Sequence, residues 1–120
     1  MYKIRKNKYG NKKNVYNGIK FDSTKEKNRY IELKLLEKSG RIKNLELQPK
    51  FLLTETKRKS DYPYLDKTLR KMYYIADFKY INENGKIIVE DTKGFKTDTY
   101  IVKKKIFIEK YGKDLEFYEL

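Results

Sequence analysis

The segment IIVEDTKG, residues 87–94, ends an apolar, β-branched run with an aspartate and a lysine two positions apart. Side chains along a strand alternate between its two faces, so Asp91 and Lys93 point to the same side as Val89. The adjacent Glu90 points to the other side. A surface ion pair at a frayed strand end is one interpretation of this spacing. A second carboxylate on the same face would instead indicate a functional site, not a surface ion pair.

A second carboxylate, Asp77, lies on the preceding predicted strand. The intervening ENGK suits a type I turn followed by a left-handed glycine, which is the three-residue hairpin loop with a G1 bulge. This loop pairs Ile81 with Ile87 and places Asp77 directly opposite Asp91. A two-residue loop would instead turn Asp77 to the opposite face. Two facing carboxylates repel, and both ionise only with a cation between them. We therefore expect a divalent metal there, with Lys93 supplying part of the compensating charge.

The amino-acid types exclude several kinds of site. The 120 residues contain no histidine and no cysteine, which excludes an imidazole base, disulfides, and zinc sites built on His or Cys. A metal must therefore bind through oxygen atoms, as Mg²⁺ and Mn²⁺ do. No apolar run approaches a membrane span, and the N-terminus lacks the apolar region of a signal peptide, so we expect a cytoplasmic protein without a membrane partner.

Positive charge dominates the chain, with 30 Lys and Arg against 17 acids and a formal charge of +13. This excess favours a polyanion such as nucleic acid over a membrane surface, because no amphipathic helix concentrates the charge. A coding bias toward lysine would raise the count but would not explain its clustering. Two clusters interleave with tyrosines, as in segments that bind phosphates and stack on bases. They contain Lys3, Arg5, Lys6, Lys8, Lys12 and Lys13, and then Lys57, Arg58, Lys59, Lys67, Arg70 and Lys71.

The elements that must position these residues are predicted from periodicity and turn signals. We expect a flexible basic arm over residues 1–14 and a single domain over 15–120. The order helix, three strands, helix, strand predicts an α/β (α+β) fold with a mixed central sheet flanked by helices. The predicted elements are a hairpin at 15–21 around Asn17 and Gly18, a helix at 23–39 stopped by Gly40, a strand within 42–53 that Pro49 breaks or places at an edge, an aperiodic mobile loop at 55–70, strands at 72–81 and 86–92, a helix at 97–111 ended by Gly112, and a strand at 115–120.

Glu26 lies in the first turn of the first predicted helix. Ser23 and Glu26 match a capping box, in which the glutamate reaches back to the backbone N–H of the cap. Helical periodicity also places Glu26 with Tyr30 and Leu33 on the face toward the core. A buried carboxylate is costly unless it is hydrogen-bonded or paired. The cap, the predicted site, or both in different states could satisfy it.

These residues resemble a known superfamily as a set. IADF followed by VEDTKG, after a helix that carries a glutamate, resembles the PD-(D/E)xK nuclease superfamily, whose common core is helix, three strands, helix, strand. Ala76 replaces the proline of the superfamily name, a common substitution. From about residue 8 to the end, the chain is similar to a phage and prophage domain of formerly unknown function in that superfamily. The similar stretches are KYG, GIKFDSTKE, RYIELKLLEKSGRIKNLELQPKF, YIADF, VEDTKGFKTD and KKKIF.

The resemblance implies a restriction-endonuclease-like core and a metal-dependent DNA endonuclease that hydrolyses phosphodiester bonds by in-line attack. Asp77 and Asp91 would bind Mg²⁺ together with the backbone carbonyl of Thr92, and Mn²⁺ would be able to substitute. Lys93 would orient the attacking water or stabilise charge in the transition state. Glu26 would reach a second metal site or hold a metal-bound water.

Two further residues are weaker candidates. Lys104 lies between Tyr100 and Phe107 on the apolar face of the second helix. It either extends along that face toward solvent or contacts the scissile phosphate. Gln48, near the end of the first core strand, bonds either into the site or to nearby backbone.

The substrate and assembly stay open. Branched DNA, as cut by phage junction resolvases of the superfamily, is one expected substrate, and it would favour a homodimer because two strands are cut symmetrically. The expected setting is phage DNA processing in the cytoplasm of a bacterial host, with a phage or prophage origin. A nuclease-fold DNA-binding protein with little activity is the alternative, against which the full carboxylate set argues. A basic RNA-binding or ribosome-associated protein would leave the facing acids unexplained.

Overall fold

The computed structural model describes residues 14–120. The predicted arm at 1–14 therefore lies outside the described residues except for Asn14. The same holds for its six cations, Lys3, Arg5, Lys6, Lys8, Lys12 and Lys13. Within residues 14–120, no helix is long and apolar enough to cross a membrane.

A small hairpin precedes the first helix. Strands β1 (Val15–Tyr16) and β2 (Ile19–Lys20) pair in antiparallel fashion. Asn17 and Gly18 between them have φ angles of 52° and 78°. Both positive values are what a type I′ turn requires, so the predicted hairpin is confirmed.

Helix α2 (Thr24–Lys38) begins and ends where its capping residues predict. The Oγ atom of Ser23 accepts a hydrogen bond from the N–H of Glu26 at 3.1 Å. This bond gives a partner to one of the backbone N–H groups that have none within the first turn of the helix. At the other end Gly40 has a φ of 84°, a left-handed conformation that favours glycine.

The central sheet has four strands and mixed directions. Its order is β3 (Lys43–Leu47), β6 (Phe78–Ile81), β7 (Ile87–Asp91) and β8 (Glu116–Glu119). The β7–β8 pair is parallel, and the other two pairs are antiparallel. Helix α3 (Asp98–Tyr111) connects the parallel strands, as such a crossover requires. The predicted α+β class and mixed sheet are thus confirmed.

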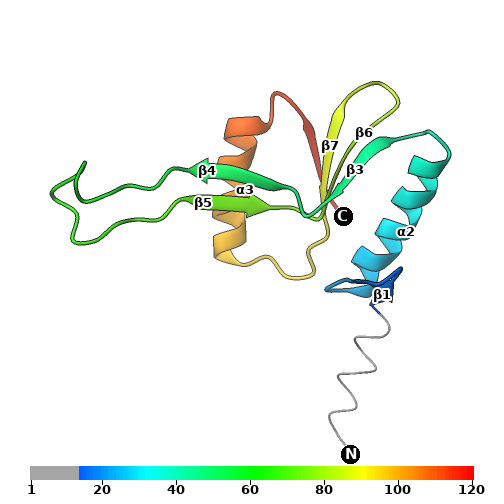
Figure 1. The fold of residues 1–120 in the computed structure, drawn as a ribbon, viewed down its shortest axis with the longest axis horizontal. Helices are drawn as coiled ribbons and strands as arrows, with labels where there is room; N and C mark the ends of the chain where they lie inside the picture. The colour runs from blue at the N-terminus through cyan, green and yellow to red at the C-terminus, as the bar shows by residue number, and fades with distance from the viewer. Residues whose placement is uncertain (1–13) are drawn as a thin grey trace, which may run out of the picture.

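The two helices lie on opposite sides of this sheet (Figure 1). One buried cluster joins α2 to one face and consists of Phe21, Tyr30, Leu33, Ile42, Phe78, Tyr80 and Ile88. The other joins α3 to the opposite face and consists of Leu53, Tyr74, Ala76, Val89, Tyr100 and Phe107. Because Ile88 and Val89 are neighbours on β7 and belong to different clusters, the strand is covered on both faces, which explains its continuous apolar run.

The two longest predicted strands are each broken: the break at Pro49 is one of the two predicted outcomes there, whereas the break in the second strand was not predicted. The segment predicted at 42–53 divides into β3 and β4 (Lys50–Thr54), and the segment predicted at 72–81 divides into β5 (Met72–Ile75) and β6. Gln48, with a φ of 50°, and Pro49 form the first break. The breaks face each other, because the N–H of Gln48 donates to the carbonyl of Asp77 at 2.9 Å and the N–H of Ala76 donates to that of Pro49 at 3.2 Å.

Strands β4 and β5 therefore leave the central sheet as a separate antiparallel pair. Beyond them, residues 55–71 continue the hairpin, which projects far from the rest of the molecule in Figure 1. Lys57 and Leu69 form an isolated antiparallel bridge within it. Apart from this bridge, residues 55–71 form turns and irregular backbone, as the predicted loop at 55–70 requires, and its mobility stays a prediction.

Candidate active site

The β6–β7 hairpin has the predicted register. Ile81 pairs with Ile87, and the ladder continues to the pair of Phe78 with Glu90. The N–H of Gly85 donates to the carbonyl of Asn82 at 3.0 Å, and the φ of Gly85 is 80°. This is the turn followed by a left-handed glycine that the sequence ENGK predicts.

Asp77 and Asp91 follow directly beyond the last pair of this ladder. Their carboxylates are close enough that Asp77 contributes to raising the pKa of Asp91. The hairpin thus brings together the two acids that the sequence selected, one at the entry to β6 and one at the end of β7.

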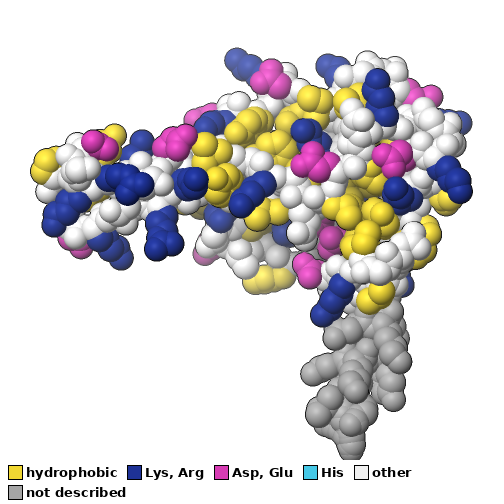
Figure 2. Space-filling view, viewed as in Figure 1, with side chains coloured by type: hydrophobic (Ala, Val, Ile, Leu, Met, Phe, Trp, Pro, Cys, Tyr) yellow, Lys and Arg dark blue, Asp and Glu magenta, His cyan; other side chains and the backbone are white. Residues whose placement is uncertain are grey.

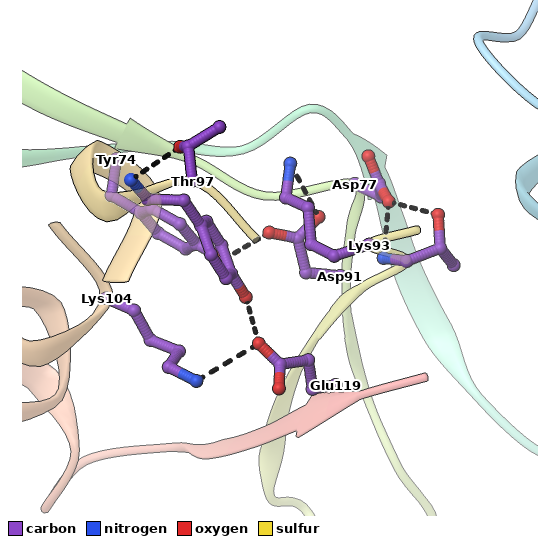
Figure 3. Close-up of polar contacts among 9 residues, drawn as sticks. Tyr74, Asp77, Asp91, Lys93, Thr97, Lys104 and Glu119 are labelled. Carbon is purple, nitrogen blue, oxygen red and sulfur yellow. Dashed lines mark hydrogen bonds and ion pairs between the residues drawn. The ribbon is translucent and has the colours of Figure 1, made fainter. Parts of the chain in front are cut away.

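Asp91 is fully buried. Its Oδ2 atom accepts a hydrogen bond from the hydroxyl of Tyr74. Its Oδ1 atom has no hydrogen-bond partner among the described residues, and the Nζ atom of Lys93 lies 3.7 Å away, in ion-pair range but beyond hydrogen-bond length. Figure 3 shows Lys93 and Tyr74 beside Asp91. One oxygen of Asp91 is therefore held firmly, and the other has capacity for a cation.

The protonation of Asp91 depends on this environment. Burial raises the pKa of Asp91 to about 7; the hydrogen bond from Tyr74 opposes that rise, Asp77 adds to it, and Lys93 opposes it. Burial and the bond to Asp91 raise the pKa of the Tyr74 hydroxyl as well, so Tyr74 stays a donor. Without a metal, Asp91 is thus partly protonated near neutral pH, and a divalent cation would favour its charged form.

Asp77 is held by Thr92. Its Oδ2 atom accepts hydrogen bonds from both the N–H and the Oγ1 hydroxyl of Thr92, each at 2.7 Å. These bonds cross from β7 to the start of β6 and fix the Asp77 carboxylate beside Asp91 (Figure 3). Coordination by the backbone carbonyl of Thr92 stays a prediction.

Glu26 reaches the same region from α2. It is buried, and it lines a pocket of about 180 Å³ with Gln48, Asp77 and Lys20. The pKa of Glu26 is raised to about 7, chiefly by burial and also by the charges of Asp77 and Asp22, while a hydrogen bond with the backbone of Asp22 opposes the rise. The predicted burial of Glu26 is confirmed, and the pocket connects it to Asp77.

Gln48 contributes its backbone to the site. Its N–H donates to the carbonyl of Asp77, which supports the interpretation of a nearby backbone bond. Gln48 also lines the pocket that contains Glu26. The left-handed conformation of Gln48 thus positions Asp77 at the break between β5 and β6.

Lys104 is anchored by an acid that the sequence reasoning missed. Its Nζ atom donates to the Oε2 atom of Glu119 at 3.1 Å, and the Nζ atom of Lys96 lies 3.1 Å from Oε1. The hydroxyl of Tyr100 also donates to Glu119, and this bond, together with the two lysines, lowers the pKa of Glu119 to about 2. The Nζ atom of Lys93 lies 5.1 Å from the centre of the Tyr100 ring.

The predicted site is thus surrounded by four residues that the sequence analysis did not assign to it: Tyr74, Tyr100, Lys96 and Glu119. Glu119 pairs with Asp91 in the parallel β7–β8 register. The only sequence signal for this group was the position of Tyr100 one turn before Lys104 on the same helix face.

Glu90 points away from the site, as alternation predicts. Glu90 is nonetheless buried, and it accepts hydrogen bonds from Arg29 Nε at 2.7 Å and Nη2 at 2.6 Å. The hydroxyl of Tyr80 donates to it as well. Glu90 therefore joins β7 to α2 on the far side of the sheet, a structural role that the sequence analysis did not predict.

The donors available for a metal are carboxylate oxygens. Within the described part of the chain, no group of three or more acidic side chains lies in an arrangement ready to hold a metal ion. Asp77 and Asp91 form a pair, with Glu26 across the pocket. The free Oδ1 atom of buried Asp91 and the all-oxygen donor set fit a hard cation such as Mg²⁺.

Comparison with known proteins gives one match. The family model of DUF1064, described as a protein of unknown function, matches residues 6–118. No curated protein and no solved structure matches the chain.

Proposed function

Because the chain belongs to the DUF1064 family, whose function is unknown, we propose from the site geometry that the protein is a metal-dependent DNA endonuclease that hydrolyses phosphodiester bonds. The observation that carries the proposal is the facing pair of Asp77 and Asp91 beside Lys93, with one buried carboxylate oxygen free of hydrogen bonds. A purely structural role gives no reason to bury a carboxylate without a full set of partners.

Membership of the PD-(D/E)xK superfamily, with a restriction-endonuclease-like core, forms part of the proposal. The order α2, β3, β6, β7, α3, β8 supports it, because these elements form the central sheet and its two covering helices. The β4–β5 hairpin is then an insertion between β3 and β6.

Asp77 and Asp91 would hold Mg²⁺, with Mn²⁺ able to substitute. When bound, the ion would polarise a phosphate oxygen and lower the pKa of a coordinated water. Asp91 is prepared for this role because Tyr74 fixes one of its oxygens and leaves the other open. Thr92 prepares Asp77 in the same way through its two hydrogen bonds.

Lys93 and Glu26 would act on the phosphate, on the attacking water or on a second metal. The ammonium of Lys93 has no hydrogen bond to Asp91 at 3.7 Å, so it retains donors for a phosphate oxygen or for the attacking water. Glu26 would orient that water or reach a second metal from the opposite wall of the pocket. Lys104 is committed to Glu119, which supports a positioning role over direct contact with phosphate.

The distribution of charge supports DNA as the substrate. Lys57, Arg58 and Lys59 are exposed on the projecting hairpin, along which Lys and Arg gather in Figure 2. Branched DNA, a homodimer, and phage DNA processing in the cytoplasm of a bacterial host belong to the same proposal, with the resemblance as their support.

A DNA-binding protein with little or no catalytic activity is the second candidate. One observation favours it: no group of three acidic side chains suited to metal binding is present within residues 14–120.

A cleavage assay separates the two candidates. The full-length protein is incubated with linear duplex, nicked duplex and four-way-junction DNA, in Mg²⁺ and in EDTA, and binding is measured on the same DNA in parallel. Cleavage that requires Mg²⁺ is the result expected for the endonuclease. Tight binding without cleavage in Mg²⁺ or Mn²⁺ would replace it with the second candidate.

A further inference from the structure

Residues 55–71, here called the basic ribbon, form a two-stranded extension of the β4–β5 hairpin. Lys57 and Leu69 exchange backbone hydrogen bonds of 2.8 and 2.9 Å across it, an isolated bridge that pairs the two sides once beyond β4 and β5. The N–H of Lys71 donates to the Oγ1 atom of Thr56 at 3.3 Å. Beyond the bridge, the N–H of Asp61 donates to the carbonyl of Arg58 at 3.0 Å and closes a turn near the tip.

The basic ribbon carries a net positive charge. Its six cations face three acids in sequence, Glu55, Asp61 and Asp66. None of the six is in an ion pair with any residue that the structure describes. Figure 2 shows dark blue side chains spread along the projecting hairpin. A solvent-exposed two-stranded element with cations on both edges suits a polyanion that runs along it.

One side of the basic ribbon forms an open groove of about 860 Å³. Cations from both strands line it: Lys57 comes from the outgoing strand, and Lys67 and Arg70 come from the returning strand. Glu55 is the single acid of the lining. The groove therefore offers positive charge at both edges, which matches the two phosphate rows that border a groove of duplex DNA.

The basic ribbon is coupled to the candidate active site through β5. Tyr74 of β5 holds Asp91 by its hydrogen bond, and Asp77 follows two residues after the end of β5. Leu69 lies eight positions before Asp77, which limits their separation to about 26 Å, the length of a fully extended chain. That limit corresponds to about eight base-pair steps along duplex DNA.

We propose that the basic ribbon lies in the major groove of duplex DNA, with its base within about eight base pairs of the phosphate at the active site. The major groove admits a two-stranded β-ribbon, and the cations on both edges contact the phosphates that flank it. The eight-base-pair placement rests on the proposed function, whereas the contact with duplex DNA does not. The substrate is thus a DNA whose duplex extends from the cut to the basic ribbon.

Binding in EDTA tests the contact without any catalysis. Affinity for a 30-base-pair duplex (the length being our choice, about three helical turns) is measured over a range of salt concentrations. The ribbon variant carries Lys57→Ala, Lys67→Ala and Arg70→Ala, and its matched control carries Lys38→Ala, Arg41→Ala and Lys43→Ala. Both lose two lysines and one arginine, and the control residues are exposed at the end of α2 and the start of β3.

The ribbon variant should weaken binding by about tenfold or more and lower the slope of log K against log salt by about 2.7, because three phosphate contacts are lost. The control should change the slope much less. Equal effects of the two variants would overturn the proposal. So would undiminished binding of the ribbon variant.

Placement on DNA is tested with one introduced cysteine, because the chain contains none. Ser60→Cys near the ribbon tip, carrying an iron–EDTA reagent, should cut duplex DNA in one cluster about one helical turn from the Mg²⁺-dependent cut site. Ser39→Cys at the end of α2 serves as the control and should give no such cluster. Glucosylated hydroxymethylcytosine, whose sugar projects into the major groove, should reduce binding when it replaces cytosine at the base pairs where that cluster of cuts lies.

The outcomes separate the two proposals. A ribbon footprint on duplex without Mg²⁺-dependent cleavage would sink the endonuclease and leave the DNA contact standing. Cleavage without a ribbon footprint would do the reverse. Tighter binding to single-stranded DNA, lost in Tyr64→Ala, would replace the major-groove contact with base stacking on the exposed Tyr64.

Discussion

The hydroxyl of Tyr74 donates a hydrogen bond to Oδ2 of Asp91, and this contact leaves Oδ1 facing the ammonium of Lys93 at 3.7 Å. Tyr74 therefore positions the carboxylate on which the proposed chemistry depends. It acts from β5, the strand that also leads to Asp77.

Tyr74→Phe should raise the Mg²⁺ concentration that cleavage requires and also lower the stability of the fold. Loss of the hydroxyl leaves Oδ2 of buried Asp91 without its donor, a destabilisation of about 1–3 kcal/mol. Loss of such a supporting bond lowers metal affinity by about 10–100-fold. Single-turnover cleavage over a Mg²⁺ titration and thermal denaturation measure the two effects.

Tyr80→Phe is the matched control, because it removes the same hydroxyl from Glu90 on the opposite face. It should lower the melting temperature comparably and leave the Mg²⁺ requirement unchanged. Equal shifts of the Mg²⁺ requirement in both variants would mean that Tyr74 acts only through general stability.

The importance of Tyr74 was not predictable from alternation. On an uninterrupted strand over 72–81, Tyr74 and Asp77 occupy positions of opposite parity and thus opposite faces. The break at Ala76 and Asp77 changes that relation. It depends on hydrogen bonds to Gln48 and Pro49, which lie nearly thirty residues earlier in the sequence, so no local pattern reveals it.

Local signals were sufficient where structure is local. The turn chemistry of ENGK predicted the register that brings Asp77 to Asp91, and Ser23 predicted the start of α2. Glu119 could not be found this way, because its position opposite Asp91 depends on β8 pairing in parallel with β7 across a helix. Periodicity identifies the face of a strand but not its partner.

Stability without metal should fall as pH rises from about 4 to about 7. The pKa of Asp91 and that of Glu26 are both raised to about 7 in the folded chain, from 3.8 and 4.5. Between those values the folded state binds more protons than the unfolded state, so the free energy of unfolding decreases with pH and levels off above pH 7. The Asp91 shift corresponds to about 4 kcal/mol.

Thermal denaturation in EDTA from pH 4 to pH 8 measures this dependence. Asp91→Asn should flatten the profile and raise the melting temperature at pH 8, because it removes a buried charge beside Asp77. Mg²⁺ should restore stability to the wild type at pH 8. A wild-type profile that rises over this pH range would contradict the assignment of the two acids as the dominant groups.

Glu90→Ala should destabilise the protein by about 3–5 kcal/mol, because it leaves the guanidinium of half-buried Arg29 without its buried partner. The cleavage rate of the folded fraction should persist, since Glu90 lies on the other side of the sheet. Chemical denaturation gives the stability, and cleavage at a low temperature gives the rate. An inactive but stable variant would place Glu90 in the chemistry.

Deletion of residues 1–7 should lower DNA affinity and spare the single-turnover rate at saturating DNA. Those residues, which lie outside the described part of the chain, carry three of the predicted phosphate contacts. Lys93→Ala should do the reverse, because one ammonium beside Asp91 contributes to the transition state while many surface cations contribute to binding. Loss of cleavage at saturation in the deletion would make the N-terminal segment part of the active site.

The most direct test compares two neighbouring acids on opposite faces of β7. Single-turnover cleavage of DNA is measured in Mg²⁺ for Asp91→Asn and for Glu90→Gln, each shown to be folded by circular dichroism at the assay temperature. Asp91→Asn should reduce the rate by about 10³-fold or more, whereas Glu90→Gln should leave the rate near that of the wild type. Cleavage that survives in folded Asp91→Asn would contradict the proposed site.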